Sequence, residues 1–133
     1  MKFKQTERQR ANTIEALTVM MPSIPVANIF PKLASWIDGE GEIPHCGTVA
    51  CFGGWCAIYP PFVAQGVGRC RQDGQPFLLK RGYSTTEVSQ HLFGNPNMFR
   101  MRGFFVHELD SGTDHAIIMH RLQWLLDTSE VVA

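Results

Sequence analysis

The spacing of apolar and polar positions in the first forty residues predicts two helices. Thr6 with Gln9 three residues later is a capping-box signature, and Pro22 ends the helical pattern that follows it. A second helix is predicted to open at Asn28, with Pro31 tolerated in its first turn. The inner face of the first helix is predicted to hold Ile14, Leu17 and Met21. The inner face of the second is predicted to hold Phe30, Leu33, Ala34 and Ile37.

The segment 48–59 is predicted to be a helix at the centre of the fold. Thr48 is a suitable N-cap, the residues that follow carry no charged side chain on any face, and Pro60 and Pro61 end the run. Gly53 and Gly54 each lower helix propensity by about 1 kcal/mol relative to alanine. Their presence in such a helix indicates close packing against a neighbouring backbone.

The second half of the chain predicts a hairpin and two more helices. The segment 67–80 has the pattern of two short strands around an Asp-Gly turn. Ser84 with Glu87 is a second capping box, before a helix that Gly94 ends. The last helix is predicted to start near Thr113, and its inner stripe to hold Ile118, Leu122 and Leu125. We therefore expect a mainly α, bundle-like single domain, 1–133, around the buried helix 48–59, with a small β-hairpin near 67–80.

Charge is balanced overall but segregated along the chain. The net charge is +0 and only 18% of residues are charged, which disfavours a general nucleic-acid binder. The segment 60–102 has six basic residues against two acidic ones, a local charge of +4, whereas 103–133 has one against five, a local charge of −4. The two segments are expected to attract each other within the fold, or the basic segment to bind an acidic partner. The candidate partner-binding residues are Arg69, Arg71, Lys80, Arg81, Arg100 and Arg102.

Apolar runs and cysteine content place the protein in the cytoplasm. No stretch of 18 apolar residues is present, and the polar start of the chain does not resemble a signal peptide. We therefore expect no contact with a membrane. The four cysteines are expected to be reduced thiols, because four in 133 residues do not make a disulfide-dense scaffold.

The string from His45 to Trp55, HCGTVACFGGW, is the most distinctive in the chain. It resembles a C-G-T-x-x-C-x-x-G-W motif of small phage and bacterial proteins to which no activity is assigned. The resemblance extends to Trp36, to the helix ending at Phe93 and to the last helix, about two-thirds of the chain. It implies a mostly helical domain from a phage or mobile element. The chain departs from the motif at Phe52 and Gly53, where a small aliphatic residue and alanine are expected, and in its additional Cys56.

Two kinds of chemistry could use the same cysteines. Cys46 and Cys51, placed before and within the first turn of the predicted helix, are candidate nucleophiles with His45 as base, since a helix N-terminus lowers a thiol pKa. The same His45, Cys46 and Cys51 with Cys70 are candidate zinc ligands. Residues five apart on a helix point about 140° apart, which disfavours a shared metal. The simpler interpretation makes Cys51 and Cys56 small apolar fillers of a packed helix.

The function favoured by these observations is a non-catalytic interaction protein, encoded by a phage, that binds and modulates a protein of the bacterial host. No cofactor is expected, and a homodimer is an alternative assembly. A cysteine-dependent enzyme or Cys/His metal protein centred on 45–51 is the first alternative. A nucleic-acid binder using the basic segment 69–81 is the second.

Overall fold

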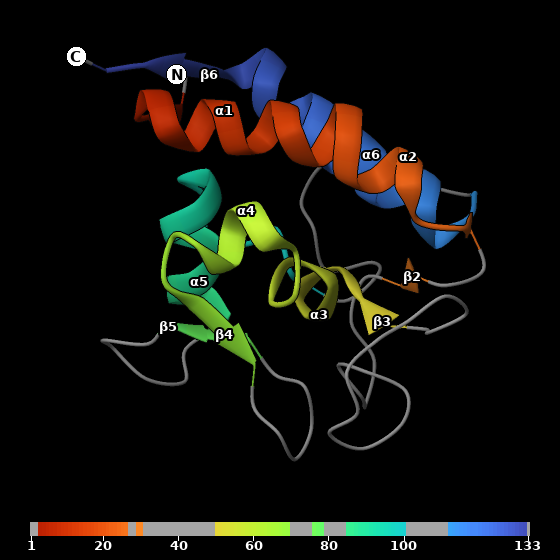
Figure 1. Ribbon diagram of the computed structural model, residues 1–133. Helices are drawn as coiled ribbons and strands as arrows, with labels where there is room; N and C mark the ends of the chain where they lie inside the picture. The colour runs from red at the N-terminus through yellow and green to blue at the C-terminus, as the bar shows by residue number, and fades with distance from the viewer. Residues whose placement is uncertain are drawn as a thin grey trace.

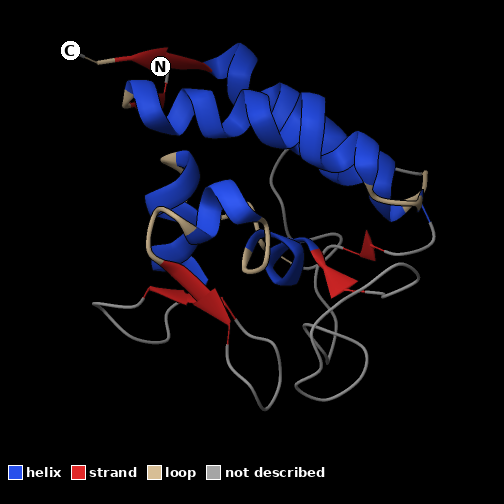
Figure 2. Ribbon diagram, in the orientation of Figure 1, coloured by secondary structure: helices blue, strands red, loops and turns tan. Residues whose placement is uncertain are grey.

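The computed structural model describes residues 3–26, 29–30, 50–69, 76–78, 85–100 and 112–132. Most of these residues are helical, which confirms the mainly α fold class. The helices form two layers (Figures 1 and 2). The outer layer holds the N-terminal helix, whose parts are α1 (Glu7–Glu15), the π-helical η1 (Ala16–Met20) and α2 (Met21–Ser23), beside the last helix, α6 (Asp114–Thr128). The inner layer holds α3 (Phe52–Cys56), α4 (Pro60–Val63) and α5 (Thr85–Phe93).

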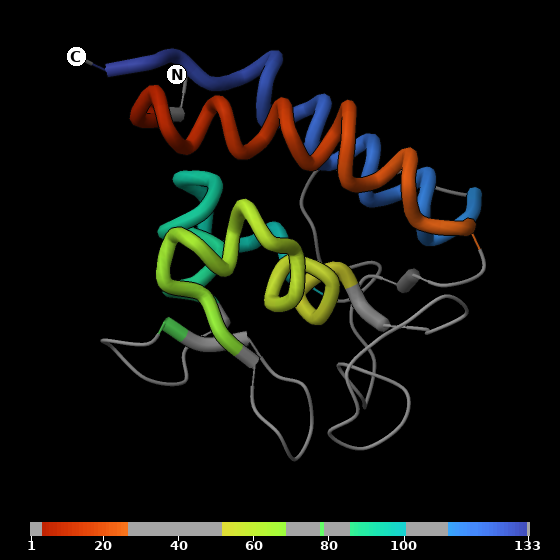
Figure 3. The backbone as a smooth tube through the Cα atoms, in the orientation of Figure 1, coloured from red at the N-terminus to blue at the C-terminus, as the bar shows by residue number. Residues whose placement is uncertain are grey.

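Three two-stranded sheets complete the described architecture. A parallel pair joins β1 (Phe3–Gln5) to β6 (Ser129–Val131), so the two ends of the chain lie on the same side of the molecule (Figure 3). Lys4 and Glu130 face each other in this pair, and Lys4 Nζ lies 2.6 Å from Glu130 Oε1. The predicted hairpin is confirmed as β4 (Val67–Arg69) antiparallel to β5 (Pro76–Leu78), and its Asp-Gly turn lies outside the described residues.

The remaining sheet corrects two helix predictions. Ile29–Phe30 (β2) pairs in parallel with Ala50–Cys51 (β3), so these two residues of the predicted second helix form a strand. The rest of that helix, including Leu33, Ala34 and Ile37, lies outside the described residues. Because Ala50–Cys51 forms β3, the central helix begins at Phe52 instead of Thr48, and it ends at Cys56. A short apolar run is compatible with a buried strand as well as with a buried helix. Each of the two segments β2 and β3 forms a strand because the other is available as its pairing partner. The prediction that this segment is buried is confirmed for Phe52, Gly53, Gly54 and Cys56.

The signals at helix ends are confirmed where the structure describes them. The Thr6 hydroxyl accepts from Gln9 N at 3.1 Å, and Gln9 Oε1 accepts from Thr6 N at 2.9 Å, which is the predicted capping box. Thr113 caps α6 by accepting from Ala116 N at 3.1 Å. Gly94 follows α5 with φ +74°, as a helix-ending glycine does. The N-terminal helix ends at Ser23, one residue beyond the end predicted at Pro22.

The π-helical stretch keeps one side of the long N-terminal helix against the core. Besides Thr13 and Met21, its buried residues follow at intervals of four: Asn12, Ala16, Met20 and Ile24. Each four-residue step overshoots an α-helical turn by about 40°, so a straight α-helix would rotate this series out of the core. The wider turn of η1, where Met21 N donates to Ala16 O, offsets that drift.

The predicted inner face of this helix is wrong at Ile14, whose side chain is 42% exposed, while Leu17 is half-buried and Met21 is buried. Asn12 and Thr13 occupy the buried side instead. The inner stripe predicted for α6, by contrast, is confirmed because Ile118, Leu122 and Leu125 are all fully buried. Val88 and Leu92 of α5 are fully buried as well.

Phe93, the last residue of α5, is the centre of an aromatic cluster. Its ring stacks on Phe52 with centroids 5.7 Å apart, and it meets Phe62 and Phe99 edge to face at 5.8 and 6.2 Å. All four rings are almost fully buried. Since aromatic pairs in these geometries stabilise by about 0.5–1.5 kcal/mol beyond their buried area, this cluster fixes α3, α4 and α5 relative to one another.

Side-chain amides of the outer layer cap the C-terminal end of α5. Gln5 Nε2 donates to Phe93 O at 2.8 Å, Asn12 Nδ2 to Leu92 O at 2.9 Å, and Gln9 Nε2 to Gln90 O at 3.0 Å. The last carbonyls of a helix have no partner within the helix, so buried ones need donors from elsewhere. We call these hydrogen bonds from Gln5, Gln9 and Asn12 to α5 the polar seam. They explain why the outer helix buries an amide where its sequence pattern predicts an aliphatic residue.

We predict that Gly94→Ala destabilises the protein more than Gly66→Ala. Both glycines have positive φ, +74° and +93°, and alanine in this region costs about 1–2 kcal/mol. A Cβ at Gly94 would also lie 2.7 Å from Gln9 Oε1, the atom that closes the Thr6 capping box, whereas a Cβ at Gly66 meets nothing within 4 Å. Urea denaturation should give a difference of about 1–2 kcal/mol between the variants. Equal losses would contradict this role of Gly94.

Candidate functional site

The cysteine and histidine residues proposed for catalysis or metal binding are mostly beyond the described residues. His45, Cys46 and Cys70 lie outside them, and the backbone of Cys51 forms strand β3. Cys51 therefore lies immediately before α3 and not within its first turn. Its role as a nucleophile or zinc ligand stays a prediction. Cys56 is a reduced, fully buried thiol, as expected of an apolar filler.

Two of the six candidate basic residues fall within the described ranges. The backbone of Arg69 belongs to β4 and pairs with Pro76, and Arg100 is exposed at the end of the segment that follows α5. Arg71, Lys80, Arg81 and Arg102 lie outside the described residues. The grouping of the six into one surface therefore stays a prediction, as does the attraction between the basic and acidic segments.

The segment 94–100, which carries Arg100, is held by side-chain hydrogen bonds at several points. Ser89 Oγ donates to Asn95 O at 2.5 Å and accepts from Met98 N at 3.1 Å, and Ser89 is fully buried. Asn95 Oδ1 accepts from Asn97 N at 2.8 Å, in an Asx-type turn. The Arg100 guanidinium donates through Nε to Asn97 Oδ1 at 3.0 Å.

A buried arginine fixes the end of the same segment. Arg121 on α6 is fully buried, and its Nη1 donates to Arg100 O at 2.6 Å and to Met98 O at 3.4 Å. A buried guanidinium is tolerated only where its donors find acceptors, so these carbonyls and the charge stabilise each other. Arg121 therefore positions the backbone of Arg100 while its own charge is hidden from solvent.

The outer helix exposes two aliphatic side chains and buries two polar ones. Ile14 and Val19 are 42% and 50% exposed. On the other side, Asn12 is buried and exchanges hydrogen bonds with Gln65, whose Nε2 lies 2.9 Å from Asn12 Oδ1. Thr13, fully buried, accepts from Gln5 Nε2 at 3.0 Å. The same buried side holds Ala16, Met20 and Met21 of the core, so amides and apolar side chains share the side that packs inward, while Ile14 and Val19 are exposed.

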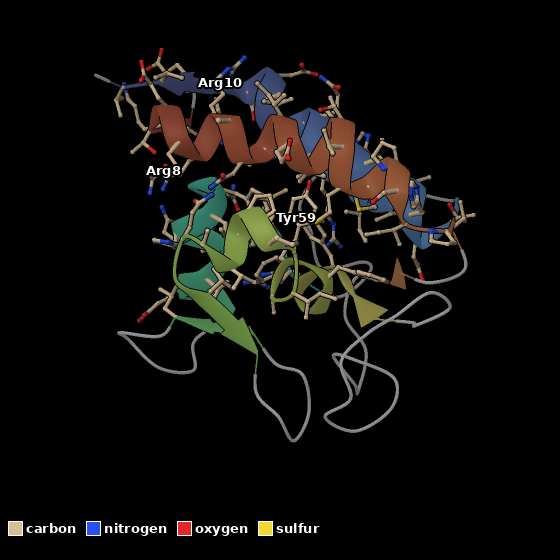
Figure 4. The ribbon with its side chains drawn as sticks, viewed as in Figure 1. Arg8, Arg10 and Tyr59 are labelled. Atoms are coloured by element: carbon tan, nitrogen blue, oxygen red, sulfur yellow. The ribbon has the colours of Figure 1, made fainter. Side chains whose placement is uncertain are left out.

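Tyr59 connects this helix to the inner layer, and it lies between α1 and α4 (Figure 4). Its hydroxyl donates to Glu15 Oε1 at 2.9 Å, and its ring meets Phe62 edge to face at 5.0 Å. Burial raises the pKa of Tyr59 to about 12, with the hydrogen bond to Glu15 and the negative charge of that carboxylate adding to the effect. Figure 4 also places Arg8 and Arg10 on different sides of α1; Arg10 Nη1 reaches Leu126 O at 3.5 Å.

Neither a metal site nor a membrane span is present in the described ranges. There, His, Cys, Asp and Glu side chains form no group of three or more that could hold a metal ion. His115 and His91 instead contact backbone carbonyls, those of Met21 at 2.8 Å and Gln65 at 2.9 Å. No helix in this part of the chain is long and apolar enough to cross a bilayer.

Comparison of the chain with family models, with curated proteins and with solved structures gives no match. The resemblance of the His45–Trp55 string to small phage and bacterial proteins therefore stays an expectation.

Sequence reasoning missed the residues that define the two described surfaces. The spacing of Ile14 fits a helical inner face and predicts a core position, and the sequence pattern gives Arg121 no role beyond its charge. The sequence does contain one indication that Arg121 is buried. It is the only Lys or Arg after residue 102, and it is next to Leu122 of the apolar stripe of the last helix. No comparable local signal marks Asn12 as buried, because its partners are 53 and 80 residues away in sequence.

We predict that Tyr59→Phe removes part of the alkaline destabilisation of the protein. The folded-state pKa of about 12 exceeds the ordinary value of 10.0, so above pH 10 the unfolded chain loses this proton first. The stabilisation is complete below pH 10 and is lost as the pH rises toward 12. Urea denaturation at pH 7, 10 and 11 should give a steeper loss for the wild type than for Tyr59→Phe. The other tyrosine, Tyr83, is present in both proteins, so its ionisation cancels in the comparison. Stability that falls equally with pH in the two proteins would contradict the prediction.

The burial of Asn12 and the exposure of Ile14 predict unequal losses of stability for two neighbouring alanine substitutions. Asn12→Ala removes the donor to Leu92 O and the partner of Gln65, and should cost about 1–3 kcal/mol. Ile14→Ala should stay within about 0.5 kcal/mol of the wild type, because its side chain is 42% exposed. Chemical denaturation measures both. A larger loss for Ile14→Ala would show that the helix presents the other side to the core.

Proposed function

We propose that the chain is a non-catalytic interaction protein, encoded by a phage, that binds and modulates a protein of its bacterial host through the outer face of the N-terminal helix. The observation that supports this proposal is the exposure of Ile14 and Val19 on a helix that buries Asn12 and Thr13. Exposed apolar side chains that lie together, unlike single scattered ones, are typical of surfaces that bind another protein.

The helix that carries these side chains is well suited to present them. It is capped by Thr6, bound to α5 through Gln5, Gln9 and Asn12, and bound to the inner layer through Glu15 and Tyr59. A surface held in one conformation loses little conformational entropy on binding. The partner that fits is a protein with an apolar patch of its own, since aliphatic side chains offer no hydrogen bonds to a polar one.

The proposal predicts that recovery of a partner depends on Ile14 and Val19. The wild type, Ile14→Gln/Val19→Gln and a control, Val63→Gln/Val131→Gln, should be used for affinity capture from a bacterial lysate. The control removes two aliphatic residues of matching exposure, 42% and 41%, from α4 and β6. The wild type and the control should recover one stoichiometric partner, and the outer-helix variant should recover it about tenfold less well.

Circular dichroism and light scattering complete this experiment. Both double variants should keep the wild-type helix content, since all four positions are exposed. Absence of a stoichiometric partner, or equal recovery by the two variants, would contradict the proposal. A wild-type dimer that the outer-helix variant dissociates would mean that this face binds a second copy instead of a host protein.

A further inference from the structure

Arg100 is an exposed cation whose guanidinium group is already held in place. An arginine has five N–H donors, and the one on Nε is bound to Asn97 Oδ1 at 3.0 Å. The four donors on Nη1 and Nη2 belong to a side chain that is exposed to solvent. A long side chain usually loses rotamer freedom when it binds, and the bond to Asn97 has restricted that freedom in advance.

The backbone beneath Arg100 is fixed from two directions. Arg121 Nη1 binds the Arg100 carbonyl at 2.6 Å, and Arg100 N donates to Asn97 O at 3.2 Å in a turn. The turn is itself attached to the end of α5 through buried Ser89, which binds Asn95 O and Met98 N. The Arg100 side chain is thus attached to a segment, 94–100, whose two ends are both hydrogen-bonded to buried side chains.

We propose that Arg100 is a preorganised anchor for a carboxylate, the side chain of Asp or Glu on a partner protein. The planar guanidinium edge matches a carboxylate with two parallel hydrogen bonds, and Asn97 acts as the positioning residue that orients it. The inference rests on the proposed function for the existence of a protein partner, and it adds an acidic residue to the apolar patch expected of that partner.

A nucleic-acid phosphate is disfavoured as the ligand by the charge of the protein. Binding to a polyanion draws its affinity from the neutralisation of several phosphates at once. The segment 60–102 has a local charge of +4, but the chain as a whole has 12 basic and 12 acidic residues, which gives little net attraction for such a polymer. A single oriented arginine suits a single carboxylate.

The test is titration of the isotope-labelled protein with a blocked pentaglutamate peptide, followed by NMR of the arginine Nε–Hε signals. The Arg100 signal, assigned from its loss in Arg100→Gln, should shift and saturate. Arg100→Gln should weaken binding about tenfold, and Arg8→Gln, which removes an exposed arginine from α1, should bind like the wild type. Asn97→Ala should weaken binding severalfold while the Arg100 signal still responds, which a purely structural role would not produce.

Two results would overturn the inference: an Arg100 signal that the peptide does not move, or equal weakening by Arg100→Gln and Arg8→Gln. Tighter saturable binding of a single-stranded oligonucleotide would assign the site to phosphate instead. This experiment is independent of the capture experiment on the outer helix. A peptide response without any captured protein would refute the proposed function alone, and a captured protein without a peptide response would refute the carboxylate anchor alone.

Discussion

The end of α5 is buried, and its carbonyl groups therefore need hydrogen-bond donors from other parts of the chain. Gln5, Gln9 and Asn12 supply them, which places β1 and α1 across the end of α5. Because an unsatisfied buried carbonyl costs about 1–3 kcal/mol, this set of bonds strongly restricts how the outer helix can rotate about its axis. Glycine at position 94, with its positive φ, lets the chain leave α5 close to those amides.

Phe93 joins this polar seam to the apolar core. Its carbonyl accepts from Gln5, while its ring is the centre of the cluster with Phe52, Phe62 and Phe99. A shift of the outer layer would therefore disturb both the capping bonds and the aromatic packing. The segment after Gly94 is tied in turn to the outer layer by Arg121 of α6. The two layers are thus connected at the end of α5 and again at the end of the segment that follows it.

The surfaces that remain for function follow from these connections. Because Asn12 and Thr13 are required on the inner side of the helix, Ile14 and Val19 lie on its outer side. Because Arg121 is required beneath residues 98 and 100, Arg100 is presented on a fixed backbone. Under the proposed function, Ile14 and Val19 would supply hydrophobic contact with another protein and Arg100 a charged hydrogen bond.

The sequence by itself determined the mainly α class, the hairpin and the boundaries at Thr6, Gly94 and Thr113, because caps and turns depend on residues within a few positions of each other. Only the tertiary structure decided that Ile29–Phe30 and Ala50–Cys51 are strands, since each needs the other as a partner. It also decided which side of the first helix is buried. Apolar periodicity measures the preference of side chains for water, whereas this helix is oriented by bonds to carbonyls about eighty residues away in sequence.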